Sequence, residues 1–294
     1  MSENEGKHQQ QGQNPIPGPG QNDGDVALVA RLRRDALAIR RTFLRMHFAA
    51  RAGHIGSGLS GIDVLTYLYG RWLRAPQDRF LLGKGHGASS LYATLHHHGI
   101  LSPEELRTYY QDGTLLPAHP APRAFAAIPA ATGSLGHGLP IAVGMAHAFR
   151  NIHQGDGRVA CLLSDGDCNE GATWEAALFA GHHALDNLVV VVDRNGIQGF
   201  GRTEDVLRLE PFASKWEAFG FSVAEVDGHD FAQLRAAFED APAGRPRCVI
   251  ARTVKGKGVS FMEDTVDWHY LPMNEAQYQQ AVAELERIET ELAR

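Results

Sequence analysis

The chain has 294 residues, 44% of them hydrophobic, which is enough to bury the core of one large domain or two small ones. A formal net charge of -6 gives no overall positive field to attract nucleic acid or an anionic membrane. Three cysteines are too few for a disulfide framework, and the sequence shows neither a signal peptide nor an apolar run near the ~20 residues that span a bilayer. We therefore expect a globular, cytoplasmic protein.

The first 24 residues are rich in Gln, Asn, Gly and Pro and contain almost no large apolar side chain. We expect residues 1–24 to form a disordered tail. Residues 25–294 are then expected to form one domain, because neither an internal repeat nor a Pro/Gly-rich linker divides them.

Residues 26–51 place apolar side chains at helical spacing, with arginines between them. Such a basic cluster could bind polyanions, but the spacing favours the solvated face of an amphipathic helix. The arginines concerned are Arg31, Arg34, Arg41 and Arg45.

A glycine-rich loop, AGHIGSGLSGID, is expected to lead into a second amphipathic helix. Ser60 and Asp63 resemble a capping pair at its start. The apolar face of this helix would carry Ile62, Leu65, Leu68, Tyr69 and Trp72.

From about residue 158 the sequence alternates between apolar strands and amphipathic helices. The strands are RVACLLS, NLVVVVD, FSVAEVD and RCVIART, and the helices are expected near 172–184, 211–219 and 230–240. The run from Leu188 to Val192 is apolar on both faces, which is typical of a central parallel strand covered by helices. This pattern predicts a doubly wound α/β fold with right-handed crossovers.

Two of these strands end in oxygen-bearing side chains. LLSDGDCNEG places Asp165 after one strand, and NLVVVVDRNGIQG places Asn195 after the next. Because ligands of open parallel sheets bind beyond the carboxyl ends of the strands, we expect both side chains at one binding edge. Their oxygens suit Mg²⁺ or Ca²⁺, with phosphate oxygens completing the coordination. Alternatively, each residue only caps a helix or a turn.

Taken together, Asp-Gly, about thirty residues with an apolar strand and then Asn-Gly resemble the thiamine-diphosphate signature. GHIGSG, GKGHGASSLY, PAHP and VDWHYLP match histidine segments of transketolases in the same order, and TGSLGHGLPIAVGMA and TVKGKGVSFME extend the match to about residues 27–290. The chain resembles the N-terminal half of transketolase and, more closely, the short subunit of split transketolases. This resemblance implies transfer of a two-carbon ketol unit from a ketose or ketose phosphate to an aldose, with thiamine diphosphate and Mg²⁺, or Ca²⁺ or Mn²⁺, as cofactors.

The resemblance also implies site residues. The metal would be held by the side chains of Asp165 and Asn195 and by the carbonyl of Ile197. Glu170 matches a position near the dimer interface, although alone it would be an ordinary helix N-terminal charge. The full set expected at the cofactor is His86, Gly133, Leu135, Asp165, Gly166, Glu170, Asn195 and His269.

Four of the 15 histidines lie inside matched motifs and are candidate catalytic residues: His54, His86, His119 and His269. The resemblance places His86 at the diphosphate and reactive side, His119 at the donor's C1 hydroxyl, and His54 with His269 around the aldehyde oxygen. Imidazoles can donate to a developing alkoxide and exchange protons near neutral pH. A zinc site is the alternative, but the sequence has no His-x-x-x-His or cysteine pair to support it. We interpret a further group as structural: His96, His97, His98, His147, His153, His182, His183 and His229.

In full-length members of the family, a second domain supplies a glutamate for the aminopyrimidine. We therefore expect this chain to be inactive alone and to need a separate C-terminal subunit, most simply in an α2β2 assembly. Ser164 stands at the usual first glycine of Gly-Asp-Gly, Ser134 where many members have Pro, and His137 where they often have Gln. The alternatives are the α component of a 2-oxo acid dehydrogenase and a non-catalytic scaffold subunit.

Overall fold

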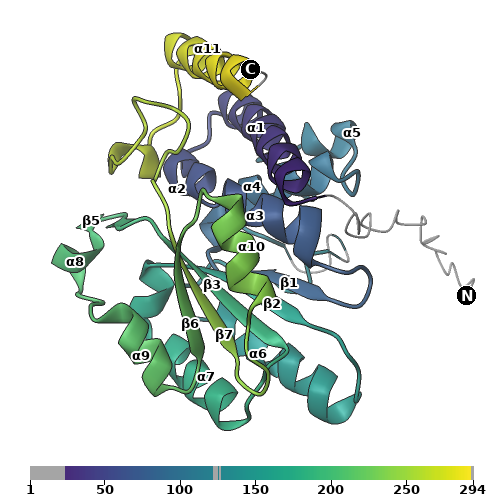
Figure 1. The fold of residues 1–294 in the computed structure, drawn as a ribbon. Helices are drawn as coiled ribbons and strands as arrows, with labels where there is room; N and C mark the ends of the chain where they lie inside the picture. Colours follow the sequence, from purple (N-terminus) through teal and green to yellow (C-terminus); the bar gives the residue numbers. More distant parts are fainter. Residues whose placement is uncertain (1–23, 122–124, 126, 293–294) are drawn as a thin grey trace, which may run out of the picture.

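Five parallel strands form the central sheet of the computed structural model, which describes residues 24–121, 125 and 127–292. The strand order is β1-β2-β3-β7-β6 (Figure 1). Every residue of β2 and β3 is buried, which explains their continuous apolar sequences. The strands are β1 (Arg79–Leu82), β2 (Val159–Ser164), β3 (Leu188–Arg194), β6 (Ser222–Asp227) and β7 (Arg247–Arg252).

Helices cover both faces of this sheet, so the doubly wound α/β prediction is confirmed. One hydrophobic cluster packs alternate strand residues against α1 (Asp25–Ala50), α3 (Ile62–Tyr67), α4 (Ala88–His97) and α10 (Phe231–Glu239). The other packs the intervening residues against α6 (Gly138–His147), α7 (Gly171–His182) and α9 (Phe212–Ala218). The chain doubles back after β6, and the crossover helix α10 accordingly lies on the opposite face from α6 and α7.

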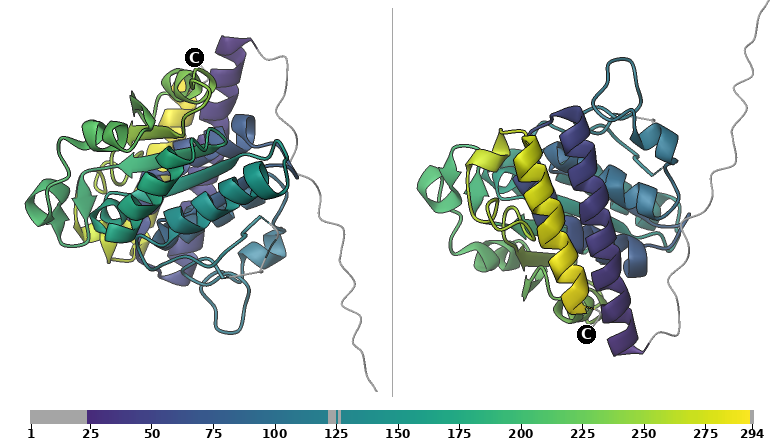
Figure 2. Two further views of the ribbon diagram at one scale, coloured as in Figure 1. Left: turned by 90° about the horizontal axis from the view of Figure 1, so that it is seen from below. Right: turned by 90° about the horizontal axis from the view of Figure 1, so that it is seen from above.

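The first predicted helix is confirmed as α1, whose apolar side chains, including Leu32 and Phe43, are buried. α11 (Glu275–Leu292) contacts α1, and the two helices lie side by side in Figure 2 (right). The predicted tail lies outside the described residues except for Gly24, which precedes α1.

The prediction for residues 52–63 needs correction. Much of the expected glycine-rich loop is helix α2 (Ile55–Ser60), and Gly61, not Ser60, is the N-cap of α3. Ser60 Oγ instead donates to Asp193 Oδ2 at 2.6 Å, while Asp63 pairs with Arg40. Both side chains are buried and have partners far away in the sequence, so these contacts replace local capping.

Several short elements complete the fold. α5 (Pro103–Leu106) starts with a capping box between Ser102 and Glu105. The expected second amphipathic helix ends in a π-helical turn at Leu68–Trp72. β4 (Ile197–Gln198) and β5 (Gly201–Arg202) form a small antiparallel ladder that precedes α8 (Thr203–Val206).

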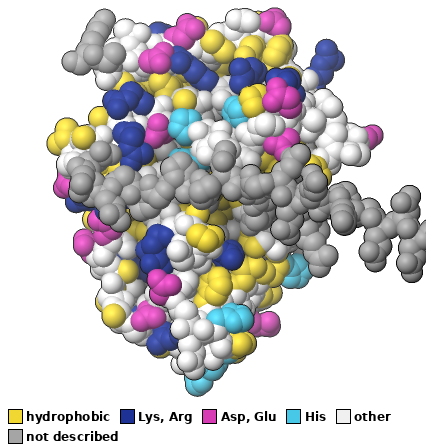
Figure 3. All heavy atoms as spheres, turned by 90° about the vertical axis from the view of Figure 1, so that its right-hand side faces the viewer, with side chains coloured by type: hydrophobic (Ala, Val, Ile, Leu, Met, Phe, Trp, Pro, Cys, Tyr) yellow, Lys and Arg dark blue, Asp and Glu magenta, His cyan; other side chains and the backbone are white. Residues whose placement is uncertain are grey.

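The surface of the described residues carries charges of both signs, interspersed on the face shown in Figure 3. In the part of the chain that the structure describes, no helix combines the length and apolar character needed to cross a membrane. The three cysteines, Cys161, Cys168 and Cys248, are buried free thiols.

Candidate functional site

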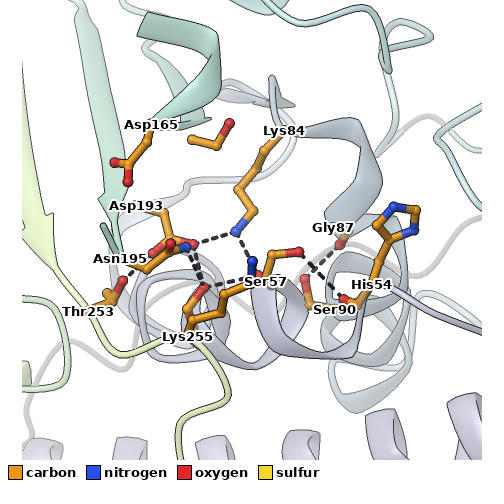
Figure 4. A network of polar contacts seen from close by, with 12 residues as sticks. His54, Ser57, Lys84, Gly87, Ser90, Asp165, Asp193, Asn195, Thr253 and Lys255 are labelled. Carbon is orange, nitrogen blue, oxygen red and sulfur yellow. Dashed lines mark hydrogen bonds and ion pairs between the residues drawn. The ribbon is translucent and has the colours of Figure 1, made fainter. Parts of the chain in front are cut away.

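Polar side chains from four parallel strands converge at the carboxyl edge of the sheet (Figure 4). We name five of them the strand-end cluster: Lys84, Asp165, Asp193, Asn195 and Lys255. Lys84 follows β1, Asp165 follows β2, and Lys255 follows β7. Asp193 and Asn195 lie at the end of β3, next to β2 in the sheet. The expected juxtaposition of Asp165 and Asn195 is therefore present.

One oxygen of Asp165 has partners and the other does not. Oδ2 accepts hydrogen bonds from the Gly196 amide at 2.8 Å and the Thr203 hydroxyl at 2.7 Å, and Arg194 lies 3.3 Å away. Oδ1 is buried and has no hydrogen-bond partner in the part of the chain that the structure describes. Burial raises the pKa of Asp165, although the charge of Arg194 opposes this. A buried carboxylate oxygen without a donor is costly, so it is suited to accept a cation.

The other two expected metal ligands adjoin Asp165. Asn195 Oδ1 accepts the Ile197 amide at 3.1 Å, and the Ile197 carbonyl lies 3.4 Å from Lys255 Nζ. This donor set is a carboxylate, an amide and a carbonyl, which fits a hard cation such as Mg²⁺. Among the described residues no group of three or more His, Cys, Asp or Glu side chains could hold a metal, so the zinc alternative gains no support there.

The two lysines of the strand-end cluster were not singled out from the sequence. Lys84 Nζ donates to the Ser57 carbonyl at 2.7 Å and forms an ion pair with Asp193. Lys255 is fully buried, and its Nζ also contacts His269 Nδ1 at 3.2 Å. Burial and the charge of Lys84 lower the pKa of Lys255 to about 8. For Lys255 a signal was available, since TVKGKG begins at the end of the predicted strand RCVIART, whereas the strand before Lys84 was not predicted.

Three loops pack closely beside the strand-end cluster, and they carry Gly85, Gly133 with Leu135, and Gly166. A Cβ atom at Gly85 would lie 2.6 Å from the Gly133 amide nitrogen, and one at Gly166 would lie 3.0 Å from Leu135 Cδ1. Asp167 joins two of these loops, because its carboxylate accepts the amides of Ser164 at 2.8 Å and Gly136 at 3.0 Å. Three residues expected at the cofactor, Gly133, Leu135 and Gly166, are thus brought together.

The four candidate catalytic histidines also come together, and we name them the histidine cluster. The His54 ring centroid lies 5.7 Å from that of His86, 6.2 Å from His119 and 5.1 Å from His269. His54 adopts a left-handed backbone conformation, with φ of 63°, and its amide donates to the His269 carbonyl at 3.1 Å. Such strain in a non-glycine residue is frequent at functional sites.

Burial lowers the pKa of every histidine in this cluster. The pKa of His269 falls to about 4, because the charge of Lys255 adds to the effect of burial. The pKa of His86 is also well below its ordinary value, with Lys84 contributing after burial. The pKa values of His54 and His119 are lowered too. The cluster therefore offers neutral imidazoles, each able to donate one hydrogen bond and accept another.

Glu170 and the histidines interpreted as structural lie outside the strand-end cluster and the histidine cluster. Glu170 is exposed at the start of α7 and packs against Gly136. His96 contacts the Leu101 carbonyl, and His183 packs near Phe179. His229 is different, since it contacts the buried Asp63.

Known proteins resemble this chain over most of its length. A family model described as "Transketolase, thiamine diphosphate binding domain" matches residues 34–286. One of the subunits of an apulose-4-phosphate transketolase from Phocaeicola vulgatus is 39% identical, over 85% of this chain and 92% of that protein. The 6-deoxy-6-sulfo-D-fructose transketolase subunit SqwG of a Clostridium species is 38% identical, over 87% of this chain and 96% of that protein.

Solved structures give the same picture. A crystal structure of transketolase from Campylobacter jejuni has a TM-score of 0.80 and 31% identity, covering 87% of this chain but 42% of that one. Human transketolase is 34% identical in sequence, over 89% of this chain and 43% of that protein. The chain thus spans nearly the whole of the named subunits and less than half of the longer enzymes.

Proposed function

This chain belongs to the transketolase family, and from this premise we propose that it is the thiamine-diphosphate-binding subunit of a two-chain enzyme. The enzyme transfers a two-carbon ketol unit from a ketose or ketose phosphate to an aldose. The observation that carries this proposal is the buried Oδ1 of Asp165, which has no hydrogen-bond partner among the described residues, in a cluster with two buried lysines, one of which contacts His269 of the histidine cluster. A metal-bound diphosphate needs such a site, because it presents both a cation and negative oxygens.

The residues present fit that cofactor. Asp165, Asn195 and the Ile197 carbonyl would hold Mg²⁺, or Ca²⁺ or Mn²⁺ in its place, and Lys84 and Lys255 would neutralise the diphosphate. We assign Gly133, Leu135 and Gly166, which lie in closely packed loops, to the ring and the diphosphate, together with His86 and His269. When bound, thiamine diphosphate supplies the carbanion chemistry of ketol transfer.

The histidine cluster would orient the sugar and move its protons. We assign His119 to the C1 hydroxyl of the donor and His54 with His269 to the aldehyde oxygen of the acceptor. Their neutral imidazoles can donate to a hydroxyl or a developing alkoxide and accept a proton at the other nitrogen. His86 would serve at the boundary between cofactor and sugar, since its ring lies 5.7 Å from those of His54 and His269.

A partner subunit is part of the proposal. Two relatives of nearly the same length are named as subunits, and the longer transketolases extend well beyond the matched region. We propose that a separate C-terminal subunit contributes the pyrimidine-binding domain and its glutamate, in an α2β2 assembly, with Glu170 near the interface. The sugars in the names of the two relatives carry a phosphate or a sulfo group, so we expect a donor with an anionic end.

Ketol transfer should be measured with thiamine diphosphate and Mg²⁺, for this chain alone and mixed with a candidate C-terminal subunit. Activity only in the mixture is the expected result. Ordinary turnover by the single chain would contradict the two-chain proposal. Release of carbon dioxide from a 2-oxo acid would favour the dehydrogenase alternative instead.

A further inference from the structure

A buried polar network lies behind the loop that carries Lys255. We name it the clamp network, and it consists of Arg40 on α1, Asp63 on α3 and His229 between β6 and α10. Arg40 donates twice to Asp63, from Nη1 to Oδ1 at 2.8 Å and from Nη2 to Oδ2 at 2.6 Å. His229 Nδ1 lies 2.6 Å from Asp63 Oδ2. Burial alone would raise the pKa of Asp63, but Arg40 and His229 hold it well below its ordinary value.

The hydrogen bonds of His229 define its tautomer. The Val254 amide donates to His229 Nε2 at 2.9 Å, so Nε2 must present a lone pair. Nδ1 then carries the proton and donates it to Asp63. His229 thus transmits the fixed position of a buried carboxylate to the residue that immediately precedes Lys255.

Neighbouring backbone groups of this loop are also tied to distant segments. The Thr253 hydroxyl donates to Asp193, and the Gly256 amide donates to the Gly56 carbonyl at 2.9 Å. On the far side of Lys255, Arg40 Nε donates to the Lys257 carbonyl at 3.3 Å. The clamp network therefore contacts the loop at two points, Val254 and Lys257, which flank Lys255.

The approach of His229 to this loop depends on Gly228. The Gly228 amide donates to the Arg252 carbonyl at 2.8 Å, and a Cβ atom there would lie 2.5 Å from Thr253 Cγ2. Only a residue without a side chain fits this close backbone approach. The sequence VDGH and the start of TVKGKG therefore meet at the exit of β7.

We propose that the clamp network positions Lys255, by fixing Val254 and Lys257 on either side so that the ammonium group is directed at the cofactor's diphosphate. The diphosphate target rests on the proposed function, whereas the positioning itself is tested on the free chain. His229, interpreted from the sequence as structural, is thereby assigned a positioning role.

The test compares His229→Ala, His229→Gln and a matched control, Asp78→Asn, in the full chain. Asp78 is another buried carboxylate bound by two arginines, Arg74 and Arg158, and it precedes β1, away from the Lys255 loop. Acylation by an amine-reactive acetyl ester, read by mass spectrometry at each lysine, reports access to Lys255. Lys84 is the internal reference, because it is equally buried but held by Asp193 and Ser57.

We expect His229→Ala to raise the acylation rate of Lys255 roughly tenfold or more, through local opening of its loop, while Lys84 stays protected. Gln offers one donor and one acceptor, so His229→Gln should restore much of the protection. Asp78→Asn should leave both lysines protected. The proposal is overturned if Lys255 stays protected in His229→Ala, if Lys84 and Lys255 become reactive together, or if Asp78→Asn opens Lys255 equally.

A second measurement separates this proposal from the proposed function. In the complex with a C-terminal subunit, His229→Ala should weaken the affinity for thiamine diphosphate with Mg²⁺ roughly tenfold, and His229→Gln should regain part of it. An unchanged affinity, with Lys255 opened, overturns the part of the proposal that directs Lys255 at the diphosphate. If the wild-type complex binds no cofactor, the proposed function fails, while the labelling result on the free chain still decides the positioning.

Discussion

The strand-end cluster and the histidine cluster adjoin each other but have opposite electrostatic character. The strand-end cluster keeps buried charges, such as the ion pair between Lys84 and Asp193. In the histidine cluster, burial lowers every imidazole pKa, and nearby lysines add to this for His54, His86 and His269, so these side chains are neutral at physiological pH. Fixed charges suit the binding of a charged ligand, whereas neutral imidazoles suit proton exchange. The difference fits the proposed roles, in which the strand-end cluster binds the cofactor's diphosphate and the histidine cluster orients the sugar, with His86 and His269 between them.

Within the strand-end cluster, the two lysines differ in whether a carboxylate balances their charge. Lys84 has a carboxylate partner, Asp193, whereas the structure records no ion pair for Lys255 among the described residues. A buried ammonium group without a counterion is unfavourable, which is why burial lowers the pKa of Lys255. A diphosphate would supply the missing negative charge.

The largest effect is expected from Asp165→Asn, which tests whether the strand-end cluster binds the cofactor. Mutation of a residue that only supports a metal ligand typically lowers metal affinity or activity by about 10–100-fold. Loss of the charge of the ligand itself should therefore lower the rate of ketol transfer by roughly 1000-fold or more. The measurement is activity of the reconstituted complex at several cofactor concentrations. Asp205→Asn, an exposed carboxylate on α8, is the control and should change little. Comparable activity in both variants would rule out Asp165 as the metal ligand.

Lys84→Met and Lys255→Met should separate the two lysines by stability. Lys84→Met leaves the buried Asp193 without its ion-pair partner, so the free energy of unfolding should fall by about 3–5 kcal/mol. Lys255→Met removes a buried cation that has no carboxylate partner and should cost little, or stabilise the cofactor-free chain. Urea denaturation of both variants measures this difference. Equal losses would mean that Lys255, like Lys84, stabilises the cofactor-free fold.

The features of this site that could be predicted are those visible in a few consecutive residues of the sequence, and the features that were missed are not. The ends of β2 and β3, with Asp165 and Asn195, were predictable because a strand apolar on both faces is visible in a few consecutive residues. β1 was missed because four residues give too short a pattern. The histidine cluster followed from family motifs, and its geometry could not be derived from spacing.

Buried polar partners account for the remaining errors. Ser60 looked like a cap, but its partner Asp193 lies 133 residues further along the chain. Asp193 was correctly placed at the end of a strand, but its contacts with Lys84, Ser60 and Thr253 were not predicted. Such pairings arise only once distant segments pack, so local sequence carries no signal for them.

The pH dependence of stability sharpens the contrast between the lysines. The pKa of Lys255 is about 8 in the folded chain and near 10.5 in an unfolded chain, so between these values the unfolded state binds more protons. Stability therefore rises with pH across this window, by up to about 3 kcal/mol from Lys255 alone. Between pH 8 and 10.5, the free energy of unfolding measured by urea denaturation should therefore rise by that amount more in the wild type than in Lys255→Met. The control is Lys257→Met, at a half-exposed lysine, whose curve of stability against pH should run parallel to that of the wild type. If the curve of Lys255→Met is also parallel to that of the wild type, the pKa of Lys255 is not lowered.

His119→Ala provides the test of the histidine cluster, and with it of the scaffold alternative. Because His119 is assigned to the donor's C1 hydroxyl and lies outside the strand-end cluster, its loss should lower kcat about 100-fold while cofactor affinity stays unchanged. His153→Ala, at an exposed histidine away from the site, is the control. Unchanged ketol transfer in His119→Ala would support a subunit that only binds cofactor and stabilises its partner. A parallel loss of cofactor affinity would instead mean that the two clusters act as one binding surface. A side chain that only orients the sugar should not weaken the binding of the diphosphate.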